Sequence, residues 1–479
     1  MVKKFLKDSF YYTIPSFFSR GLSIFLIPLY TKVLSPANYG MLDLFLAYLA
    51  FVNMTITLDI VSGLARFYIG RKNNFSKSVF ASTALYFTFI CYTIFIIFNI
   101  FFFDEISRFI IGVNGNKFFF KIGLVYLWFN GITYVLTNQL RFDSRSKDYA
   151  KVTTFNSLVT VISSFVFVIL FDLKLIGIIL GYLFGSIFTF THVMLLNKNV
   201  YKFAFSNLYL KQMLKFSFPL LFSGISVWVN LFMDRIILNH FVTLEQVGLF
   251  GIGSRLSSIA GIFIIGVQSS LGPLIYEKHE ETETSNKIAK IFRYFIFLSI
   301  VGYILLCLYS DEILRTFTTN AYLNARTVIY FLIPASILSQ IYFIFAPGPW
   351  IYKNSKFVML TNILGAFFNI FLNLLLVPNF GIIGAAISTL LTHLLIFTVN
   401  MIYSQKLYMI PYQWLPIFYS IIFAVSSIIF FNYISITGVI KYILSILLIL
   451  IFLIFSLQIK LINISELKSL KLYIFKRST

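Results

Sequence analysis

The sequence predicts an all-α polytopic membrane protein with about 14 transmembrane helices. Of its 479 residues, 59% are hydrophobic and only 11% are charged. Soluble domains are about half apolar and about one quarter charged, so this chain lacks the polar surface that water requires. Its apolar runs are also much longer than the ~10-residue strands of a membrane barrel. The composition therefore excludes a soluble enzyme, a disordered chain and a disulfide scaffold.

Apolar runs separated by charged residues or by Gly, Pro and Asn mark the predicted spans. A spanning helix needs ~20 apolar residues, and each run is close to this length or longer. We expect spans over 10–31, 41–65, 79–103, 118–140, 150–171, 175–196, 216–238, 246–274, 291–310, 324–346, 357–377, 381–403, 414–433 and 440–459.

The formal charge is +21, and the basic residues that produce it are distributed as the predicted topology requires. With the N-terminus in the cytoplasm, 27 of the 38 Lys and Arg residues fall in cytoplasmic segments, 8 fall on the opposite side and three lie within spans. This bias is what the positive-inside rule predicts for cytoplasmic termini and an even number of helices. We expect no nucleic acid partner, because topology accounts for most of the positive charge.

An internal repeat divides the predicted spans into two sets of six. Pro15 aligns with Pro219 at an offset of 204, and Tyr39-Gly40 aligns with Val247-Gly248 at an offset of 208. An even number of spans in each unit makes the repeats parallel, with a substrate site expected between them. The predicted architecture is two six-helix lobes plus two C-terminal helices. The domain bounds are 1–204 for spans 1–6, 205–405 for spans 7–12, and 406–479 for spans 13–14 and a basic cytoplasmic tail.

The sequence contains no recognisable catalytic or metal-binding motif. It has no Gly-rich phosphate loop, no metal-binding spacing of Cys or His and no nucleophile elbow. We therefore expect a transporter without catalytic residues, cofactor or metal.

Arg20 is an intramembrane cation in the first predicted span. Ionisable groups at this depth are costly and usually mark a transport pathway. Spacings of three and four place Ser16, Ser19 and Ser23 on the same helical face as Arg20. We expect this face to line a cavity, although Arg20 could instead be paired inside the helix bundle.

The second repeat carries a similar polar face. Ser226, Asn230 and Asp234 recur every four residues in the seventh span, and Arg255 lies near the middle of the eighth. We expect these residues to line the same cavity, with Arg255 binding substrate.

Five residues have two interpretations each. Arg235 is expected either to bind substrate or to reach the membrane interface, and Arg66 either to bind substrate or to set topology. Asp59 and Asp234 are expected either to pair with cations or to bind a coupling ion. His393 could carry a proton or be a hydrogen-bonded buried side chain.

Several segments resemble one known family of exporters. They are SPANYG at 35–40, GLARF at 63–67, FSFPLLFSGISVWVNLFMDRIIL at 216–238 and GIIGAAIST at 381–389. These segments resemble polysaccharide-export flippases of the O-antigen and capsule (Wzx) type. That family is part of the multidrug/oligosaccharidyl-lipid/polysaccharide exporter superfamily.

The resemblance implies a MATE-like fold and a specific function. A flippase of this family would move an undecaprenyl-diphosphate-linked oligosaccharide, such as an O-antigen or capsule repeat unit, from the inner to the outer leaflet of the bacterial cytoplasmic membrane. It would do so by alternating access through a cationic cavity. Arg20 and Arg255 would hold the diphosphate or an acidic sugar, since Arg makes bidentate contacts with phosphate. The remaining partners would be membrane lipid, H⁺ or Na⁺ as a counter-ion, and polysaccharide assembly proteins around a monomer.

Two other functions remain open from the sequence. A multidrug antiporter of the same superfamily would need carboxylates or aromatic cages for organic cations, whereas this chain places arginines at mid-depth. A membrane polysaccharide polymerase would need catalytic groups on a sizeable outer loop. The outer segments 104–117 and 311–323 are short, and we expect their charges to be solvated loop residues.

Overall fold

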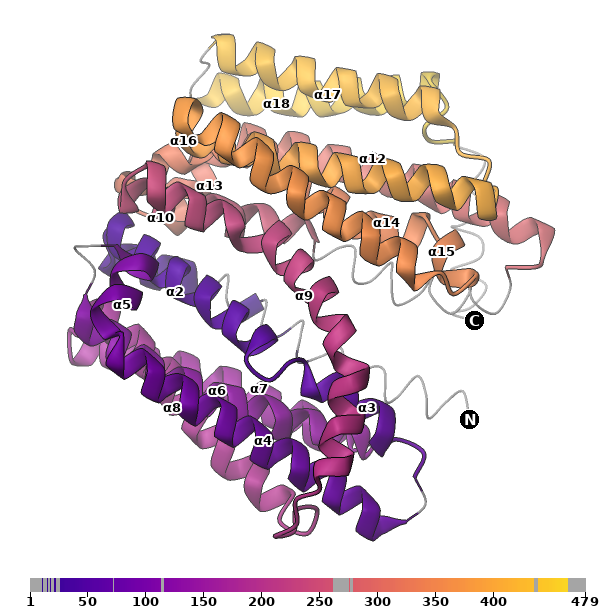
Figure 1. The fold of residues 1–479 in the computed structure, drawn as a ribbon. Coiled ribbons are helices and arrows are strands. Elements are labelled where there is room, and N and C mark those ends of the chain that lie inside the picture. The colour runs from indigo at the N-terminus through magenta and orange to yellow at the C-terminus, as the bar shows by residue number, and fades with distance from the viewer. Residues whose placement is uncertain are drawn as a thin grey trace, which may run out of the picture. The chain divides into compact units, whose positions relative to one another are not determined.

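The structure is a computed structural model that describes residues 11, 15, 18, 21–22, 26–71, 73–112, 116–261, 275, 279–434 and 438–463. Helices account for almost all of this part of the chain, which confirms the all-α class (Figure 1). They are α2 (Pro36–Thr55), α3 (Ile60–Tyr68), α4 (Asn74–Phe101), α5 (Phe103–Ile111), α6 (Lys117–Phe142), α7 (Ser146–Phe165), η1 (Val166–Leu170), α8 (Lys174–Leu196), α9 (Asn207–Phe241), α10 (Leu244–Ser257), η2 (Ser258–Gly261), α12 (Thr282–Leu308), α13 (Ser310–Phe317), η3 (Asn320–Ala325), α14 (Arg326–Phe345), α15 (Gly348–Ile351), α16 (Ser355–Leu407), α17 (Trp414–Ile434) and α18 (Val439–Gln458).

Ten helices in the described residues are long and apolar enough to cross a membrane, or eleven with one bent pair. The predicted number of 14 is not confirmed. Half of the first predicted span and most of the second half of the eighth lie outside the described residues. The predicted spans 357–377 and 381–403 correspond to the two helical arms of α16, which meet at a kink. Gly381 lies at this kink with a φ of 53° and a ψ of −132°, a conformation that glycine adopts without steric cost.

The predicted span 41–65 is broken rather than straight. Helices α2 and α3 meet at an angle of 43°. Leu58 and Asp59 form the break with φ values of 51° and 53°, in the left-handed region that ends a right-handed helix. Asp59 thus lies between two helices and not within one.

The two outer segments that were expected to be solvated loops contain short helices. Helix α5 follows α4, and α13 follows α12, each with apolar residues on one face and Asp, Glu and Arg on the other. Such amphipathic helices are suited to an interface between water and lipid.

The described helices group into two compact units, which do not follow chain order. Unit 1 contains Met1–Ile252, Phe317–Tyr322 and Ala366–Ala385, and unit 2 contains Gly253–Thr316, Leu323–Gly365 and Ala386–Thr479. The domain bounds 1–204, 205–405 and 406–479 stay a prediction.

Unit 1 has a core where α3, α4, α6 and α9 meet, around Ile60, Phe80, Val135 and Met213. A second core joins α9 to α2 and to the middle of α16. Here the Trp228 indole packs with Ala366 and donates a 3.0 Å hydrogen bond to the carbonyl of Ala47. These contacts fix the face of α9 that carries its polar residues.

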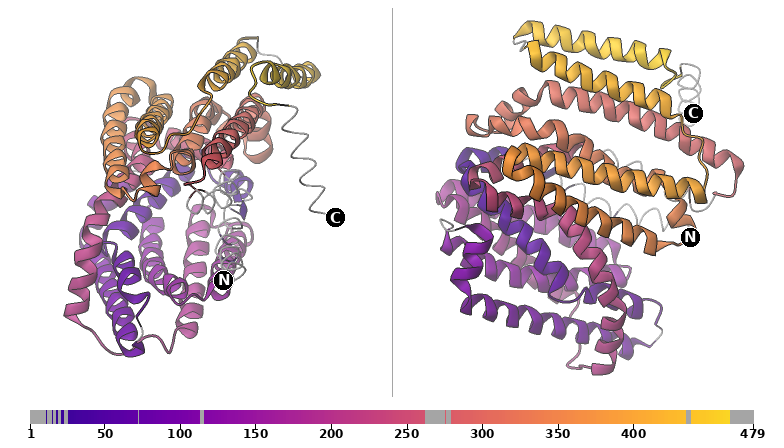
Figure 2. Two further views of the ribbon diagram at one scale, coloured as in Figure 1. Left: turned by 90° about the vertical axis from the view of Figure 1, so that its right-hand side faces the viewer. Right: turned by 45° about the horizontal axis from the view of Figure 1, so that its top comes forward.

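Unit 2 is built around α12. Its Phe292 packs against Phe345 and Tyr412, with ring centroids 4.6 and 4.7 Å apart. The helix pair α17–α18 packs side by side (Figure 2) and contacts α12, where Phe297 stacks on Phe452 at 5.7 Å.

Candidate functional site

The polar face of α9 is buried in unit 1. Ser226, Asn230 and Asp234 are 6%, 5% and 2% exposed. The Ser226 hydroxyl donates to the carbonyl of Phe222, four residues earlier, so this group is satisfied within its own helix. That this face lines a substrate cavity stays a prediction.

Arg235 forms a buried ion pair with Asp43 of α2. Its Nε lies 2.7 Å from Asp43 Oδ2, and the two side chains are 8% and 9% exposed. Its Nη1 donates to the carbonyl of Leu231, and the guanidinium faces the Phe250 ring at 5.5 Å. Removing one partner of such a pair leaves an uncompensated buried charge, which costs about 3–5 kcal/mol.

Asp234, the residue before Arg235, accepts hydrogen bonds from another helix. The amide nitrogens of Asn369 and Asn373 of α16 lie 3.2 and 2.7 Å from Asp234 Oδ1. Both asparagines are fully buried, and Asn373 also donates to the carbonyl of Asn369. The spacing of four places the two amides on one face of α16, directed at the same carboxylate.

These residues form what we call the buried polar cluster, which joins α2, α9 and α16 within unit 1. Its members are Asp43, Asp234, Arg235, Asn369 and Asn373. It combines two carboxylates, one guanidinium and two side-chain amides. Carboxylate and amide oxygens are ligands for hard cations. Among the described residues no group of three His, Cys, Asp or Glu is placed to hold a metal ion.

The other predicted cations lie apart from this cluster along the chain. Arg255 is half-buried near the end of α10, and its carbonyl accepts a 2.6 Å hydrogen bond from the Ser258 hydroxyl. Arg66 is exposed in the last turn of α3, 6.0 Å from the centroid of the Phe216 ring. Substrate binding by Arg255, Arg66 and Arg235 stays a prediction.

Two predicted titratable residues lie elsewhere. The Asp59 side chain interacts with Ser62 in the first turn of α3. His393 is buried at 8% exposure in the second arm of α16, which is part of unit 2. Neither residue joins the buried polar cluster. The predicted residues Arg20, Ser16, Ser19 and Ser23 lie outside the described residues.

Three members of the cluster were not singled out from the sequence. Asp43 lies within the predicted span 41–65, so the criterion that selected Asp59 could also have selected it. Asn369 and Asn373 have the four-residue spacing that marked the polar face of α9. Their convergence on Asp234 required the tertiary structure.

Comparison with known protein families identifies the family of this chain. A sequence profile described as polysaccharide biosynthesis protein matches residues 29–271. The chain belongs to this polysaccharide biosynthesis family. The matched part contains α2 to α10, and therefore Asp43, Asp234 and Arg235.

Two known proteins are similar in sequence to this chain. One is the probable low-salt glycan biosynthesis flippase Agl15 of Haloferax volcanii, 24% identical over 36% of this chain and 37% of the relative. The other is the uncharacterized membrane protein MJ1068 of Methanocaldococcus jannaschii, 24% identical over 51% of this chain and 50% of the relative. The chain thus matches half or less of the length of each.

Two solved structures have the same fold as most of this chain. The lipid II flippase MurJ, in an inward closed conformation, superposes with a TM-score of 0.74 over 93% of this chain and 97% of that one, at 18% identity. An inward-facing multidrug resistance MATE family transporter of the MOP superfamily gives 0.65 over 81% and 94%, at 15% identity. The predicted MATE-like fold is therefore confirmed.

Proposed function

We propose that this protein is a flippase for a lipid-linked oligosaccharide. The observation that carries the proposal is the combination of a polysaccharide biosynthesis family with the fold of a solved lipid flippase over 93% of the chain. The printed name of Agl15, a glycan biosynthesis flippase, supports the same function. Because these relatives are flippases and transporters, we propose transport without a catalytic step.

The polyprenyl tail of such a substrate needs an apolar surface, and unit 2 provides one. A groove of about 710 Å³ is lined by α12, α14, α16 and α17. Its lining is almost entirely apolar and includes Ile296, Phe331, Leu390 and Ile421. A tail in this groove would remain in a hydrocarbon environment while the headgroup moves.

The headgroup would be held by cations. We propose that Arg20 and Arg255, with contributions from Arg235 and Arg66, bind the diphosphate or an acidic sugar of an undecaprenyl-diphosphate oligosaccharide such as an O-antigen or capsule unit. Arginine suits this ligand because its planar guanidinium makes bidentate, charge-assisted contacts with phosphate. Alternating access would expose the site to each leaflet in turn.

A coupling ion would bind at Asp234, where Asn369 and Asn373 supply further polar atoms. Asp59 and His393 are the other candidates for carrying H⁺ or Na⁺. The membrane potential also contributes, because moving a headgroup of charge about −2 outward across ~100 mV is favoured by roughly 4–5 kcal/mol. We place the protein in the bacterial cytoplasmic membrane with both termini in the cytoplasm, as a monomer beside polysaccharide assembly proteins.

The test is to deplete the protein in cells and measure which leaflet holds the lipid-diphosphate oligosaccharide. We expect accumulation in the cytoplasmic leaflet, loss of surface polysaccharide and recovery on re-expression. Accumulation of single repeat units in the outer leaflet would instead indicate a polymerase. If neither pool changes and the protein exports organic cations, the multidrug antiporter function would replace the proposal.

A further inference from the structure

The same short motif occurs in the two amphipathic helices α5 and α13. Asp104-Glu105-Ile106-Ser107-Arg108 matches Asp311-Glu312-Ile313-Leu314-Arg315 at an offset of 207, close to the offsets of the internal repeat. In both copies the Asp pairs with a basic residue at the start of the following long helix. Asp104 pairs with Lys117 at 2.5 Å, and Asp311 pairs with Arg326 at 2.9 Å. The motif is therefore equivalent in structure as well as in sequence.

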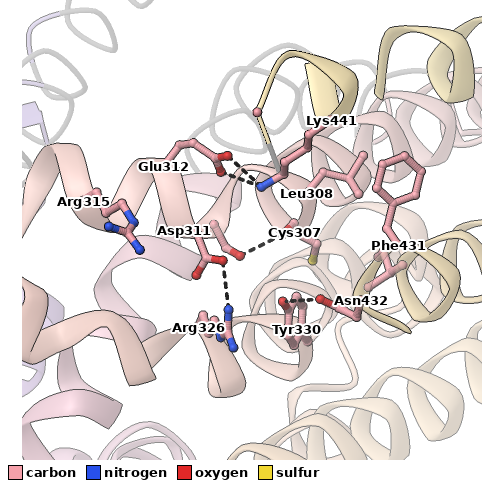
Figure 3. Close-up of a pocket in the computed structure, with 13 residues that line it drawn as sticks. Cys307, Leu308, Asp311, Glu312, Arg315, Arg326, Tyr330, Phe431, Asn432 and Lys441 are labelled. Carbon is pink, nitrogen blue, oxygen red and sulfur yellow. Dashed lines mark hydrogen bonds and ion pairs between the residues drawn. The ribbon is translucent and has the colours of Figure 1, made fainter. Parts of the chain in front are cut away.

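In unit 2 the C-terminal helix pair contacts the motif. Lys441 of α18 donates to both carboxylate oxygens of Glu312, at 2.7 and 2.8 Å. The ends of α17 and α18 then enclose, with α13 and α14, a pocket of about 400 Å³ (Figure 3). This volume lies within the range of about 300–1,000 Å³ typical of small-molecule sites.

The pocket offers donors, acceptors and aromatic surface together. The Arg315 guanidinium has no hydrogen bond or ion pair within the part of the chain that the structure describes, and Figure 3 shows it apart from the paired side chains. Asp311 uses Oδ2 for Arg326, and its Oδ1 accepts no hydrogen bond from any described residue. On the opposite side, the Tyr330 hydroxyl donates to Asn432 at 3.1 Å.

In unit 1 the residues of the motif border two other hollows. Glu105 borders a mostly apolar hollow of about 540 Å³ with Tyr48 and Trp228. Arg108 borders a different hollow, with Asn239 and His240. These two hollows share Phe109, Ile236 and Asn239, so they are neighbours. The carboxylate and the guanidinium thus border adjoining hollows there, whereas Glu312 and Arg315 line one pocket.

We propose that the pocket around Arg315 binds a saccharide that carries a carboxylate, at the end of unit 2 that the positive-inside prediction places outside the cell. Arg315 would bind the carboxylate, Asp311 Oδ1 would accept a hydrogen bond from a sugar hydroxyl, and the Tyr330 ring would contact the apolar face of the sugar. The proposal rests on the proposed function, because it assigns this pocket to the glycan part of the transported substrate after it crosses.

The test uses the purified full chain in lipid nanodiscs and saturation-transfer NMR with two soluble probes, methyl β-D-glucuronide and methyl β-D-glucoside. We expect both to bind, and the glucuronide to bind more tightly. Arg315→Gln should weaken glucuronide binding by about tenfold and leave the glucoside unchanged, since a charge-assisted pair is lost. Arg315→Lys should recover part of the difference, and Asp311→Asn should weaken both probes.

The matched control is Arg108→Gln, which makes the same change in the other copy of the motif and should alter neither probe. An equal loss in Arg108→Gln and Arg315→Gln, or no binding by wild-type protein, would overturn the proposal. Displacement of the glucuronide by equimolar inorganic phosphate, with no glucoside signal, would also overturn it by showing a simple anion site.

A leaflet assay on the wild-type protein distinguishes failure of the pocket assignment from failure of the proposed flippase function. If wild-type protein restores glycan export but binds neither probe, only the pocket assignment fails. If wild-type protein does not restore export, the proposed function fails whatever the binding result.

Discussion

Gly40 of α2 and Gly248 of α10 each lie against the backbone of the other's helix, in unit 1. A Cβ on Gly40 would collide with the carbonyl oxygen of Leu244 and lie 3.0 Å from the Gly248 nitrogen. A Cβ on Gly248 would collide with the carbonyl oxygen of Pro36 and lie 3.1 Å from the Gly40 nitrogen.

This contact is reciprocal in sequence as well as in space. Pro36 and Leu244 are 208 residues apart, as are Gly40 and Gly248, which is one of the offsets of the internal repeat. Equivalent residues that contact each other in this way are what a two-fold relation between repeated segments produces. The small residues allow the backbones of the two helices to come into contact.

The first prediction is that Gly40→Ala and Gly248→Ala each destabilise the protein by about 1–3 kcal/mol, because an added methyl group meets backbone that cannot move aside. The measurement is thermal unfolding of the detergent-purified protein. Gly302→Ala is the matched control, since a Cβ there meets nothing within 4 Å, and it should be neutral or stabilising. Equal melting temperatures for all three variants and the wild type would contradict the close contact.

The second prediction concerns the buried ion pair of Asp43 and Arg235. Asp43→Asn or Arg235→Gln alone should destabilise by about 3–5 kcal/mol, because each leaves one buried charge uncompensated. The double variant should be more stable than the sum of the two single losses predicts, which a double-mutant cycle measures.

A surface pair gives the control for this cycle. Arg145 and Asp148 lie 2.8 Å apart with side chains about one-third exposed, so Asp148→Asn should cost no more than ~1 kcal/mol. Additive effects of Asp43→Asn and Arg235→Gln would show that the two side chains do not interact.

The third prediction tests Asp234 as the coupling site. Asp234→Asn keeps the size of the side chain and removes its charge, so expression should persist while transport loses its dependence on Na⁺ or H⁺. The measurement is transport in proteoliposomes with NaCl against choline chloride, and with and without a pH gradient. Asp172→Asn, at an exposed position after η1, should leave that dependence intact. Unchanged ion dependence in Asp234→Asn would exclude this carboxylate.

The fourth prediction concerns the arginines that are proposed to bind the headgroup. Arg20→Gln and Arg255→Gln should each reduce transport strongly with normal membrane expression, and Lys should rescue only in part because bidentate geometry is lost. Leaflet distribution of the lipid-linked glycan is the readout, with Lys353→Gln, an exposed lysine, as the control. Full activity of Arg20→Gln combined with Arg255→Gln would exclude the cationic site.

Much of the fold could be predicted because hydropathy alone locates spanning helices. The runs at 118–140 and 414–433 lie within α6 and α17. The break between α2 and α3 was missed because neither Leu58 nor Asp59 is a glycine, the residue type that usually marks a left-handed conformation. Asp tolerates this conformation better than most residues, but one Asp in an apolar run does not predict a break. The helices α5 and α13 were missed because charged residues at helix ends resemble a solvated loop.

The candidate site was only partly predictable for a different reason. Asp234 and Arg235 could be identified because charged residues in a spanning helix are rare and costly. Their partners are 135 or more positions away in sequence, and no local pattern connects Asp43 to Arg235 or Asn373 to Asp234.

The sequence by itself determined that this protein lies in a membrane, the approximate position of its helices and the repeat, because each follows from composition or from local patterns. The exporter family was indicated by the resemblance of a few short segments. Only the tertiary structure decided which buried charges pair, that Gly40 and Gly248 are in contact, and that Arg315 lines a pocket while Arg108 lines another surface. These features depend on which helix faces pack together. Packing is set by the combined fit of many side chains that lie far apart in the chain.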